Sequence, residues 1–439
     1  NTAKNTDDSS VVYGFEIIKS KNTSVKENVA TSNALGGILV SGGSSNQINA
    51  NDVTGNGETG IRLSDTSFNK VTGNDARYNE HSGISISSSR GNQVNENQVS
   101  DIIDGTGVVL TNSQSNTISK NQASNNTMGI SVTGGSHNSI SENTVTNNTQ
   151  SGIGIKTSSD NTIEKNNASY NADSGILIQD STGSKVKSND AFNNTVGILV
   201  SQGSSNTLTG NTVSYNNESG IELSKTDGNT LNNNDASYNL GSGLLINNSA
   251  DNQIYNTTVV NNAENGVYLA NSEGNVINGT DSRNNQGQGI FIDSSAGNTI
   301  GEGTTVIGNL QNGILIQNST GTNLIDVDQV EHNDMHGITI ENSSEITLSG
   351  VNRVSYNAGA GVYVGNSSDV RVNQTASFQN QEGVEFYNVT GSMVGFGTNT
   401  SYNEGSGILF RESDGNTIAD TEMAAGNKEH GINIENSDS

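Results

Sequence analysis

The sequence predicts an all-β fold, a three-sided parallel β-solenoid of about 19 coils, and three observations support this prediction. A glycine followed by apolar residues at the first and third positions after it recurs nineteen times, as at Gly175 to Ile178. Successive copies are 22 to 24 residues apart. Asparagine recurs at fixed distances from these glycines, and the 439 residues include no proline. Short strands separated by Asn and Gly corners at this period are typical of a β-solenoid.

Each period contains three short apolar segments. Asparagine stands nine residues after the glycine in twelve of eighteen copies, as at Asn46, and four residues before the next glycine in sixteen of eighteen gaps. Fourteen residues after the glycine it fills ten consecutive copies from Asn28 to Asn234. We expect these amides to form hydrogen-bonded ladders between coils, and the asparagines to supply left-handed backbone at the corners. Beyond Asn234 other residues, such as Thr257, predict a rebuilt corner.

Composition excludes several classes of protein. With 45 acidic and 19 basic residues the net charge is −26, so the chain offers no basic surface for nucleic acid. No apolar run approaches the roughly 20 residues of a membrane helix, so membrane insertion is not expected. The absence of cysteine excludes disulfides and thiolate metal sites. The acidic surface suits an extracellular or cell-envelope location.

The repeat runs from Gly14 to Gly431 without a linker. We therefore expect residues 1–439 to form a single parallel β-helix domain of roughly 86 Å, if each coil adds one strand spacing. The chain begins at Asn1 without methionine, which favours a segment or mature form of a secreted protein. Both ends expose strand edges, so either the chain continues or the ends pair with other copies.

One face of the predicted solenoid carries an unusual apolar row. In the Gly-Ile-x-Ile pattern the two apolar residues point inward, so the residue between them points outward. That outward position is apolar in five of six consecutive coils, with Thr339 as the sixth. The five residues are Leu245, Tyr268, Phe291, Leu315 and Tyr363. We predict that they form a ligand or partner contact, because exposed apolar patches usually mark contacts; cover by another segment is the alternative.

A second aromatic set lies five residues before successive glycines. It comprises Tyr170, Phe192, Tyr215, Tyr238, Tyr356, Phe378 and Tyr402. These residues share strand parity with small apolar residues such as Ala168 and Ala236, so we expect them to stack inside the core.

Signals for chemistry are sparse. His and Asp concentrate only between residues 326 and 336, where the candidate metal ligands are Asp326, Asp328, His332 and His336. Only some of these side chains can share a face of a strand or corner, so we expect no bound metal and no cofactor. We assign no catalytic residue. A protein without enzymatic activity is the expectation that these signals favour over an enzyme.

The Asn and Gly-Ile-x-Ile pattern from Gly14 to Ile434 resembles the right-handed parallel β-helix repeats of NosD-like and carbohydrate-binding sugar-hydrolase proteins in the pectate-lyase-like superfamily. The resemblance implies right-handed coils. The segment Tyr13 to Glu16 is similar to the start of a mannuronan epimerase signature, Tyr-Gly-Phe-Asp-Pro-His-Asp, but Ile17, Ile18 and Lys19 replace its Pro, His and Asp. The group includes lyases, epimerases, periplasmic accessory proteins and surface proteins, so it implies the fold more than the function.

Three functions follow as hypotheses. The first is a non-enzymatic extracellular surface or envelope structural protein that self-assembles or adheres, with other copies or neighbouring surface proteins as partners. The alternative is a polysaccharide-binding or polysaccharide-modifying protein, similar to lyases and epimerases, in which the row from Tyr268 to Tyr363 stacks on sugar rings. A NosD-like periplasmic accessory protein is the third, which the four methionines and absent cysteines disfavour.

Overall fold

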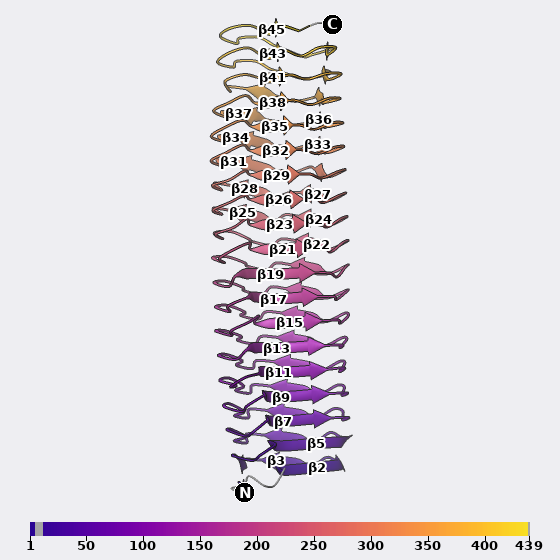
Figure 1. Ribbon diagram of the computed structural model, residues 1–439, viewed down its shortest axis with the longest axis vertical. Helices are drawn as coiled ribbons and strands as arrows, with labels where there is room; N and C mark the ends of the chain where they lie inside the picture. Colours follow the sequence, from indigo (N-terminus) through magenta and orange to yellow (C-terminus); the bar gives the residue numbers. More distant parts are fainter. Residues whose placement is uncertain (5–11, 438–439) are drawn as a thin grey trace. The chain divides into compact units, whose positions relative to one another are not determined.

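The computed structural model describes residues 1–4 and 12–437, and all regular elements in them are β-strands. Within these residues no helix is long and apolar enough to cross a membrane. The chain divides into two compact units, unit 1 from Asn1 to Val213 and unit 2 from Ser214 to Ser439. In each unit successive coils stack through parallel strands (Figure 1). The predicted all-β parallel solenoid of about 19 coils is confirmed, whereas the single domain stays a prediction.

Unit 1 has two regular sheets. The strands of its first sheet begin near the repeat glycine: β2 (Tyr13–Lys21), β5 (Gly36–Ser44), β7 (Thr59–Ser64), β9 (Ser82–Ser87), β11 (Thr106–Thr111), β13 (Met128–Thr133), β15 (Ile153–Lys156), β17 (Ser174–Gln179) and β19 (Val196–Ser201). Its second sheet contains β3 (Ser24–Lys26), β6 (Gln47–Asn49), β8 (Lys70–Thr72), β10 (Gln93–Asn95), β12 (Thr117–Ser119), β14 (Ser139–Ser141), β16 (Thr162–Glu164), β18 (Lys185–Lys187) and β20 (Thr207–Thr209). A short pair, β1 (Thr2–Ala3) and β4 (Val29–Ala30), lies on the third side.

Unit 2 has three sheets. Its first sheet contains β21 (Ile221–Ser224), β23 (Leu244–Asn247), β26 (Val267–Ala270), β29 (Ile290–Asp293), β32 (Ile314–Gln317), β35 (Ile338–Glu341), β38 (Val362–Gly365), β41 (Val384–Tyr387), β43 (Ile408–Arg411) and β45 (Ile432–Glu435). The second contains β22 (Thr230–Asn232), β24 (Gln253–Tyr255), β27 (Val276–Asn278), β30 (Thr299–Ile300), β33 (Asn323–Ile325), β36 (Thr347–Ser349), β39 (Arg371–Asn373), β42 (Met393–Val394) and β44 (Thr417–Ile418). The third contains β25 (Thr258–Val260), β28 (Asp281–Arg283), β31 (Thr305–Ile307), β34 (Gln329–Glu331), β37 (Val354–Ser355) and β40 (Ser377–Phe378).

The third side is where the units differ. In unit 1 it is held mainly by isolated bridges between coils, such as Asp52 with Asp75. In unit 2 it is a six-stranded sheet, and Thr257 and Thr280 are fully buried where unit 1 places ladder asparagines. The predicted rebuilding of this corner is therefore confirmed.

The inward side chains form the core. In unit 1, Ile153 of β15 pairs in register with Ile176 of β17, and both are fully buried. The repeat glycine Gly152 precedes Ile153, and the adjacent coil leaves no room for a side chain there. A Cβ on Gly152 would lie 2.7 Å from the carbonyl oxygen of Gly175 in the next coil.

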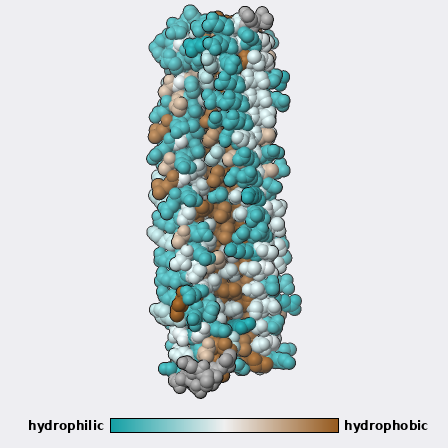
Figure 2. Space-filling view, viewed as in Figure 1, coloured by the Kyte–Doolittle hydropathy of each residue, from teal (hydrophilic) through white to brown (hydrophobic). Residues whose placement is uncertain are grey.

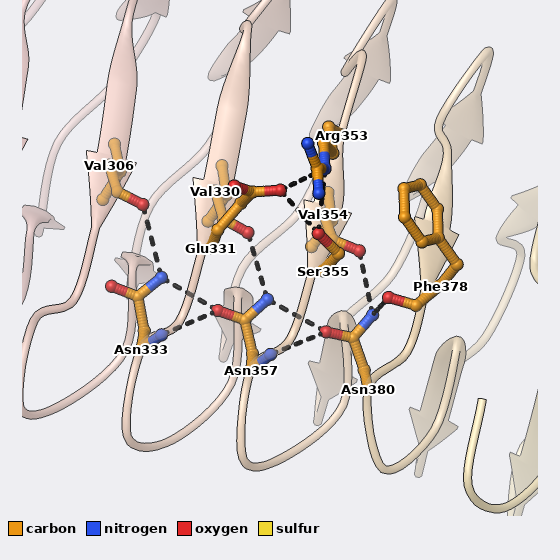
Figure 3. A network of polar contacts seen from close by, with 10 residues as sticks. All are labelled: Val306, Val330, Glu331, Asn333, Arg353, Val354, Ser355, Asn357, Phe378 and Asn380. Atoms are coloured by element: carbon orange, nitrogen blue, oxygen red, sulfur yellow. Dashed lines mark hydrogen bonds and ion pairs between the residues drawn. The ribbon is translucent and has the colours of Figure 1, made fainter. Parts of the chain in front are cut away.

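Asparagine ladders connect the coils as predicted. In unit 2 the backbone N–H and the Nδ2 of Asn333 both donate to Oδ1 of Asn357, at 3.1 and 2.9 Å. Asn357 repeats the pattern with Asn380, at 3.0 Å for both bonds (Figure 3). Each buried Oδ1 therefore accepts two hydrogen bonds, and each Nδ2 also donates to a carbonyl, as Asn357 does to Val330. Buried amides in this arrangement have their polar groups satisfied.

The prediction that ladder asparagines supply the left-handed backbone is wrong. Positive φ falls on the residue just before each ladder asparagine, for example Ser32 before Asn33 (φ 57°) and Tyr356 before Asn357 (φ 57°). Two of the asparagines predicted four residues before a glycine, Asn125 and Asn193, are left-handed, but the ladder residues there are Asn126 and Asn194, which follow the same rule. Asparagine is needed there for its amide, while its neighbour makes the turn.

This turn also overturns the predicted burial of the second aromatic set. Its five tyrosines are 43 to 66% exposed and all have positive φ, while Phe192 and Phe378 are half-buried. Strand parity assumes that side chains alternate along an extended backbone, and a left-handed residue interrupts that alternation. Ala168 and Ala236 are fully buried as expected, but Tyr170 and Tyr238, two residues later, project outward. We call these seven residues the corner aromatics.

Candidate functional site

The predicted outward row forms a continuous line across the first sheet of unit 2. Strand register pairs Leu245 with Tyr268, Tyr268 with Phe291, Phe291 with Leu315, Leu315 with Thr339, and Thr339 with Tyr363. The next two positions along this line are Glu385 and Leu409. In Figure 2, drawn from the same side as Figure 1, hydrophobic side chains interrupt a mostly hydrophilic surface over the first sheets. The structure thus brings the five predicted contact residues together; their role stays a prediction.

Exposure varies along this row. Leu245, Tyr268, Phe291 and Tyr363 are half-buried, whereas Leu315 is only 8% exposed. The rings of Tyr268 and Phe291 lie parallel, with centroids 4.8 Å apart and planes 6° apart. Parallel rings at this separation stack on each other, and we call this stacked pair the Tyr268–Phe291 platform.

A polar wall runs along one side of this row. It is built from the residue just before the repeat glycine, whose side chain accepts the backbone N–H of the equivalent residue one coil later; Ala360, which has no polar side chain, interrupts it. Asn265 accepts from Gln288 at 2.9 Å, Gln288 from Asn312 at 2.7 Å, and Asn312 from His336 at 3.1 Å. The wall therefore has fixed positions, because each side chain is tied to the next coil's backbone.

The wall and the platform enclose a hollow of about 380 Å³. It is lined by Ala263, Glu264, Asn265, Tyr268, Gln286, Gly287, Gln288, Phe291 and Gln311. Gln288 Nε2 also donates to Oε1 of Gln311, which lies in the adjacent coil. An aromatic floor beside amide and carboxylate groups can bind a ligand that has both apolar faces and hydroxyl groups.

The row continues into a group of ionisable side chains. His336 stacks on Tyr363 with centroids 4.8 Å apart, and its Nδ1 accepts the N–H of Ala360 at 2.9 Å. Burial lowers the pKa of His336, which favours the neutral ring with its proton on Nε2. Burial, together with the nearby Glu385 and Glu341 carboxylates, raises the pKa of Tyr363.

Two carboxyl groups lie near this end of the row. Burial raises the pKa of Glu385, which is partly offset by its ion pair with Arg411 at 3.2 Å. Burial also raises the pKa of Glu382, which accepts a hydrogen bond from the backbone N–H of Ser406. Both shifts follow from removing a charged group from water.

The candidate metal ligands do not form one cluster. His336 stacks on Tyr363 in the row, whereas His332 stacks on the corner aromatic Tyr356 at 4.9 Å. Asp326 is an exposed left-handed residue just after β33. Within residues 1–4 and 12–437, no three His, Asp or Glu side chains form a group that could hold a metal ion.

Sequence reasoning missed the polar wall. Its residues differ in type, being Asn265, Gln288, Asn312, His336 and Glu382, so they show no repeated letter. Their shared property is a hydrogen-bond acceptor at one position of the repeat, which an alignment of the coils by acceptor chemistry could have revealed.

Comparison with known proteins agrees with the observed fold. A family model described as the right handed beta helix region matches residues 1–106, 100–213, 197–352 and 336–439, which together span the chain. No curated protein matches the sequence.

Several solved structures share the fold at low similarity. A double mutant of the periplasmic alginate epimerase AlgG has 15% identity and a TM-score of 0.44, over 58% of this chain and 73% of that chain. The Azotobacter vinelandii mannuronan C-5 epimerase AlgE4 A-module has 16% identity and a TM-score of 0.40, over 72% and 86%. Dettilon tailspike protein has 14% identity and a TM-score of 0.42, over 76% and 62%. At these values the likenesses carry no argument about function.

Proposed function

The chain belongs to the right-handed β-helix family, and from that premise we propose that it is a polysaccharide-binding protein whose ligand lies along the outward row of unit 2. The observation that supports this proposal is the Tyr268–Phe291 platform beside a hollow lined with amides. This is the function that sequence analysis gave as its alternative. An extracellular or cell-envelope location is part of the proposal, because that is where polysaccharides are abundant.

The chemistry of a sugar ring fits this platform. Pyranose rings have apolar C–H faces and polar hydroxyl edges, so they stack on aromatic rings and hydrogen-bond at their rims. The accessible parts of the stacked Tyr268 and Phe291 rings offer an apolar surface, while Gln288, Gln311 and Glu264 line the rim. The line of register beyond the platform, through Leu315 to Tyr363, supplies a track for further sugar residues of a chain.

The polar wall favours ligand recognition as well as stability. Gln288 is tied at Oε1 to the N–H of Asn312 and at Nε2 to Gln311. A side chain held in this way loses little additional conformational entropy when a ligand binds. A preorganised wall beside two stacked aromatic rings therefore favours binding of a rigid polymer.

Removal of the aromatic side chains tests the proposal. The variant Tyr268→Ser, Phe291→Ser, Tyr363→Ser should keep its melting temperature nearly unchanged, because Ser and Glu occupy this position in other coils. Its affinity for a bound oligosaccharide should fall by about 3 kcal/mol, or roughly 100-fold in Kd, as three stacking contacts are lost. Titration calorimetry with neutral and acidic oligosaccharides measures both the choice of ligand and the loss.

The corner aromatics provide a matched control. The variant Tyr356→Ser, Phe378→Ser, Tyr402→Ser removes the same number of aromatic rings from unit 2 outside the row and should bind like the wild type. Unfolding of the row variant would show that the row is structural. Equal binding by the row variant and the wild type would place the contact surface elsewhere.

The exposed corner aromatics favour a second candidate function, adhesion or self-association. Tyr215 and Tyr238 stack at 5.4 Å with planes 17° apart, and they are 56% and 48% exposed. Exposed apolar groups of this kind often mark protein contacts. Light scattering of concentrated protein should then show association that Tyr215→Ser with Tyr238→Ser abolishes, while the row variant still associates.

A further inference from the structure

Two carboxylates lie beside the platform: Glu264 lines the hollow, and Asp293 is two residues after Phe291 on β29, so these two side chains share the outward face of the strand. Burial raises the pKa of the Tyr268 hydroxyl, and the carboxylates of Asp293 and Glu264 raise it further. Further along the row, Glu385 and Glu341 act in the same direction on Tyr363. Four carboxylates therefore act on the two tyrosine hydroxyls of the row.

Positive charge does not balance these carboxylates at the platform. None of the described residues that line the hollow is Lys or Arg. Arg411 lies at the other end of the row, where it pairs with Glu385 at 3.2 Å and Glu435 at 3.4 Å. A ligand on the platform would therefore face Glu264 and Asp293 without a lysine or arginine among the lining residues.

We propose that the row selects polysaccharides of uncharged sugar rings and rejects polyuronates. This inference rests on the proposed function, because it specifies which ligand the same site accepts. A uronate carboxylate on the platform would lie beside Glu264 and Asp293, and like charges repel more strongly where protein displaces water. It would also lose hydration without gaining an ion pair. A neutral ring meets neither cost, and an amino sugar with a free ammonium group would be attracted.

The residues that line the hollow have the chemistry that neutral sugars require. Gln286, Gln288 and Gln311 have amides that donate and accept, so they complement hydroxyl groups, which do the same. Recognition of a polyuronate chain typically needs arginine or lysine for its carboxylates. The amides and the local charge thus point to the same class of ligand.

The experiment compares three oligosaccharides of equal length, a neutral glucose hexamer, a mannuronate hexamer and a glucosamine hexamer. In 20 mM salt the neutral hexamer should bind at least tenfold more tightly than the mannuronate hexamer, and the glucosamine hexamer at least as tightly as the neutral one. In 0.5 M salt the difference between neutral and acidic ligands should shrink, because salt screens exposed charges.

Charge variants locate the effect. The double variant Glu264→Gln, Asp293→Asn should bring the two affinities within about threefold, mainly by strengthening mannuronate binding. The control Glu273→Gln, Glu302→Gln removes two exposed carboxylates from unit 2 outside the residues that line the hollow, with the same change in net charge. It should preserve the tenfold preference.

The outcomes separate the two proposals. If none of the three hexamers binds, the proposed function fails, and this inference fails with it. If mannuronate binds as tightly as the neutral hexamer at low salt, or more tightly, the inference is overturned while the proposed function stands. If the control variant reduces the preference as much as the Glu264 and Asp293 variant does, net charge determines the preference and the assignment to these two carboxylates is wrong.

Discussion

At the scale of single residues, two neighbouring residues have separate roles at each corner. Tyr356 turns the backbone with positive φ, and Asn357 joins the coils through its amide. The sequence could predict the ladder, because asparagine recurs at constant spacing. It could not predict which residue is left-handed, since Glu27, Ser32 and Tyr356 share no side-chain chemistry. The left-handed conformation is therefore determined by the position of the residue just before a ladder asparagine, and not by its own side chain.

Replacement of a ladder amide by a carboxylate tests this division. In Asn357→Asp, one oxygen can still accept from Asn333, but the carbonyl of Val330 and Oδ1 of Asn380 each lose the Nδ2 donor, and Oδ1 of Asn380 keeps only the backbone N–H. At pH 7 we expect the free energy of unfolding to fall by several kcal/mol, because a charge is buried without a partner. Protonation restores a donor, so the loss should shrink toward pH 4.

Chemical denaturation at pH 4 and pH 7 measures this difference. Asn284→Asp, at an exposed left-handed position, is the control and should change stability by less than about 0.5 kcal/mol. Equal losses for both variants would mean that the ladder contributes nothing specific.

His336 gives a pH-dependent prediction at the same scale. Burial lowers its pKa in the folded state, so its contribution to stability is present above the ordinary value of about 6.5 and is lost as pH falls through the lowered value. His336→Gln keeps an acceptor for Ala360, as Gln288 does for Asn312. The melting temperature of the wild type should therefore fall relative to the variant between pH 7 and pH 5. Parallel curves would show that His336 does not titrate in this way.

At the scale of elements, close approach between adjacent coils explains the repeat glycine near the start of the first-sheet strands. The repeat glycine is visible in the sequence, but the reason for it is not. A need for backbone flexibility and a lack of space for a side chain both predict glycine. Gly152 is not among the glycines with positive φ. A side chain there would place its Cβ 2.7 Å from both the carbonyl oxygen of Gly175 and Nδ2 of Asn171. Space, more than flexibility, requires glycine at this position.

Two alanine substitutions in one coil test this cause. Gly152→Ala should lower the free energy of unfolding by about 1 to 3 kcal/mol, because backbone atoms in the adjacent coil must move. Gly154→Ala, two residues later, meets only the flexible Met128 side chain at 3.0 Å and should cost much less. Thermal unfolding of the two variants gives the comparison. A similar change in stability for both variants would mean that close approach to the next coil is not the reason for glycine at position 152.

At the scale of the whole molecule, the fold was predictable because one short pattern repeats along the chain. The outward row was predictable too, since strand parity holds within β26, β29 and β32. Parity failed at the corners, where Tyr170 and Tyr215 became exposed. The hollow depends on how the side chains of adjacent coils are oriented, so it could only be seen in the structure.

The most direct test of the central claim is a crystal structure of the protein with a neutral oligosaccharide bound. The account predicts a sugar ring packed against the Tyr268–Phe291 platform, with its hydroxyl groups hydrogen-bonded to side chains of the polar wall such as Gln288. Further rings should follow the row toward Tyr363. Sugar bound at the corner aromatics, or at unit 1 alone, with the platform left empty, would contradict the claim.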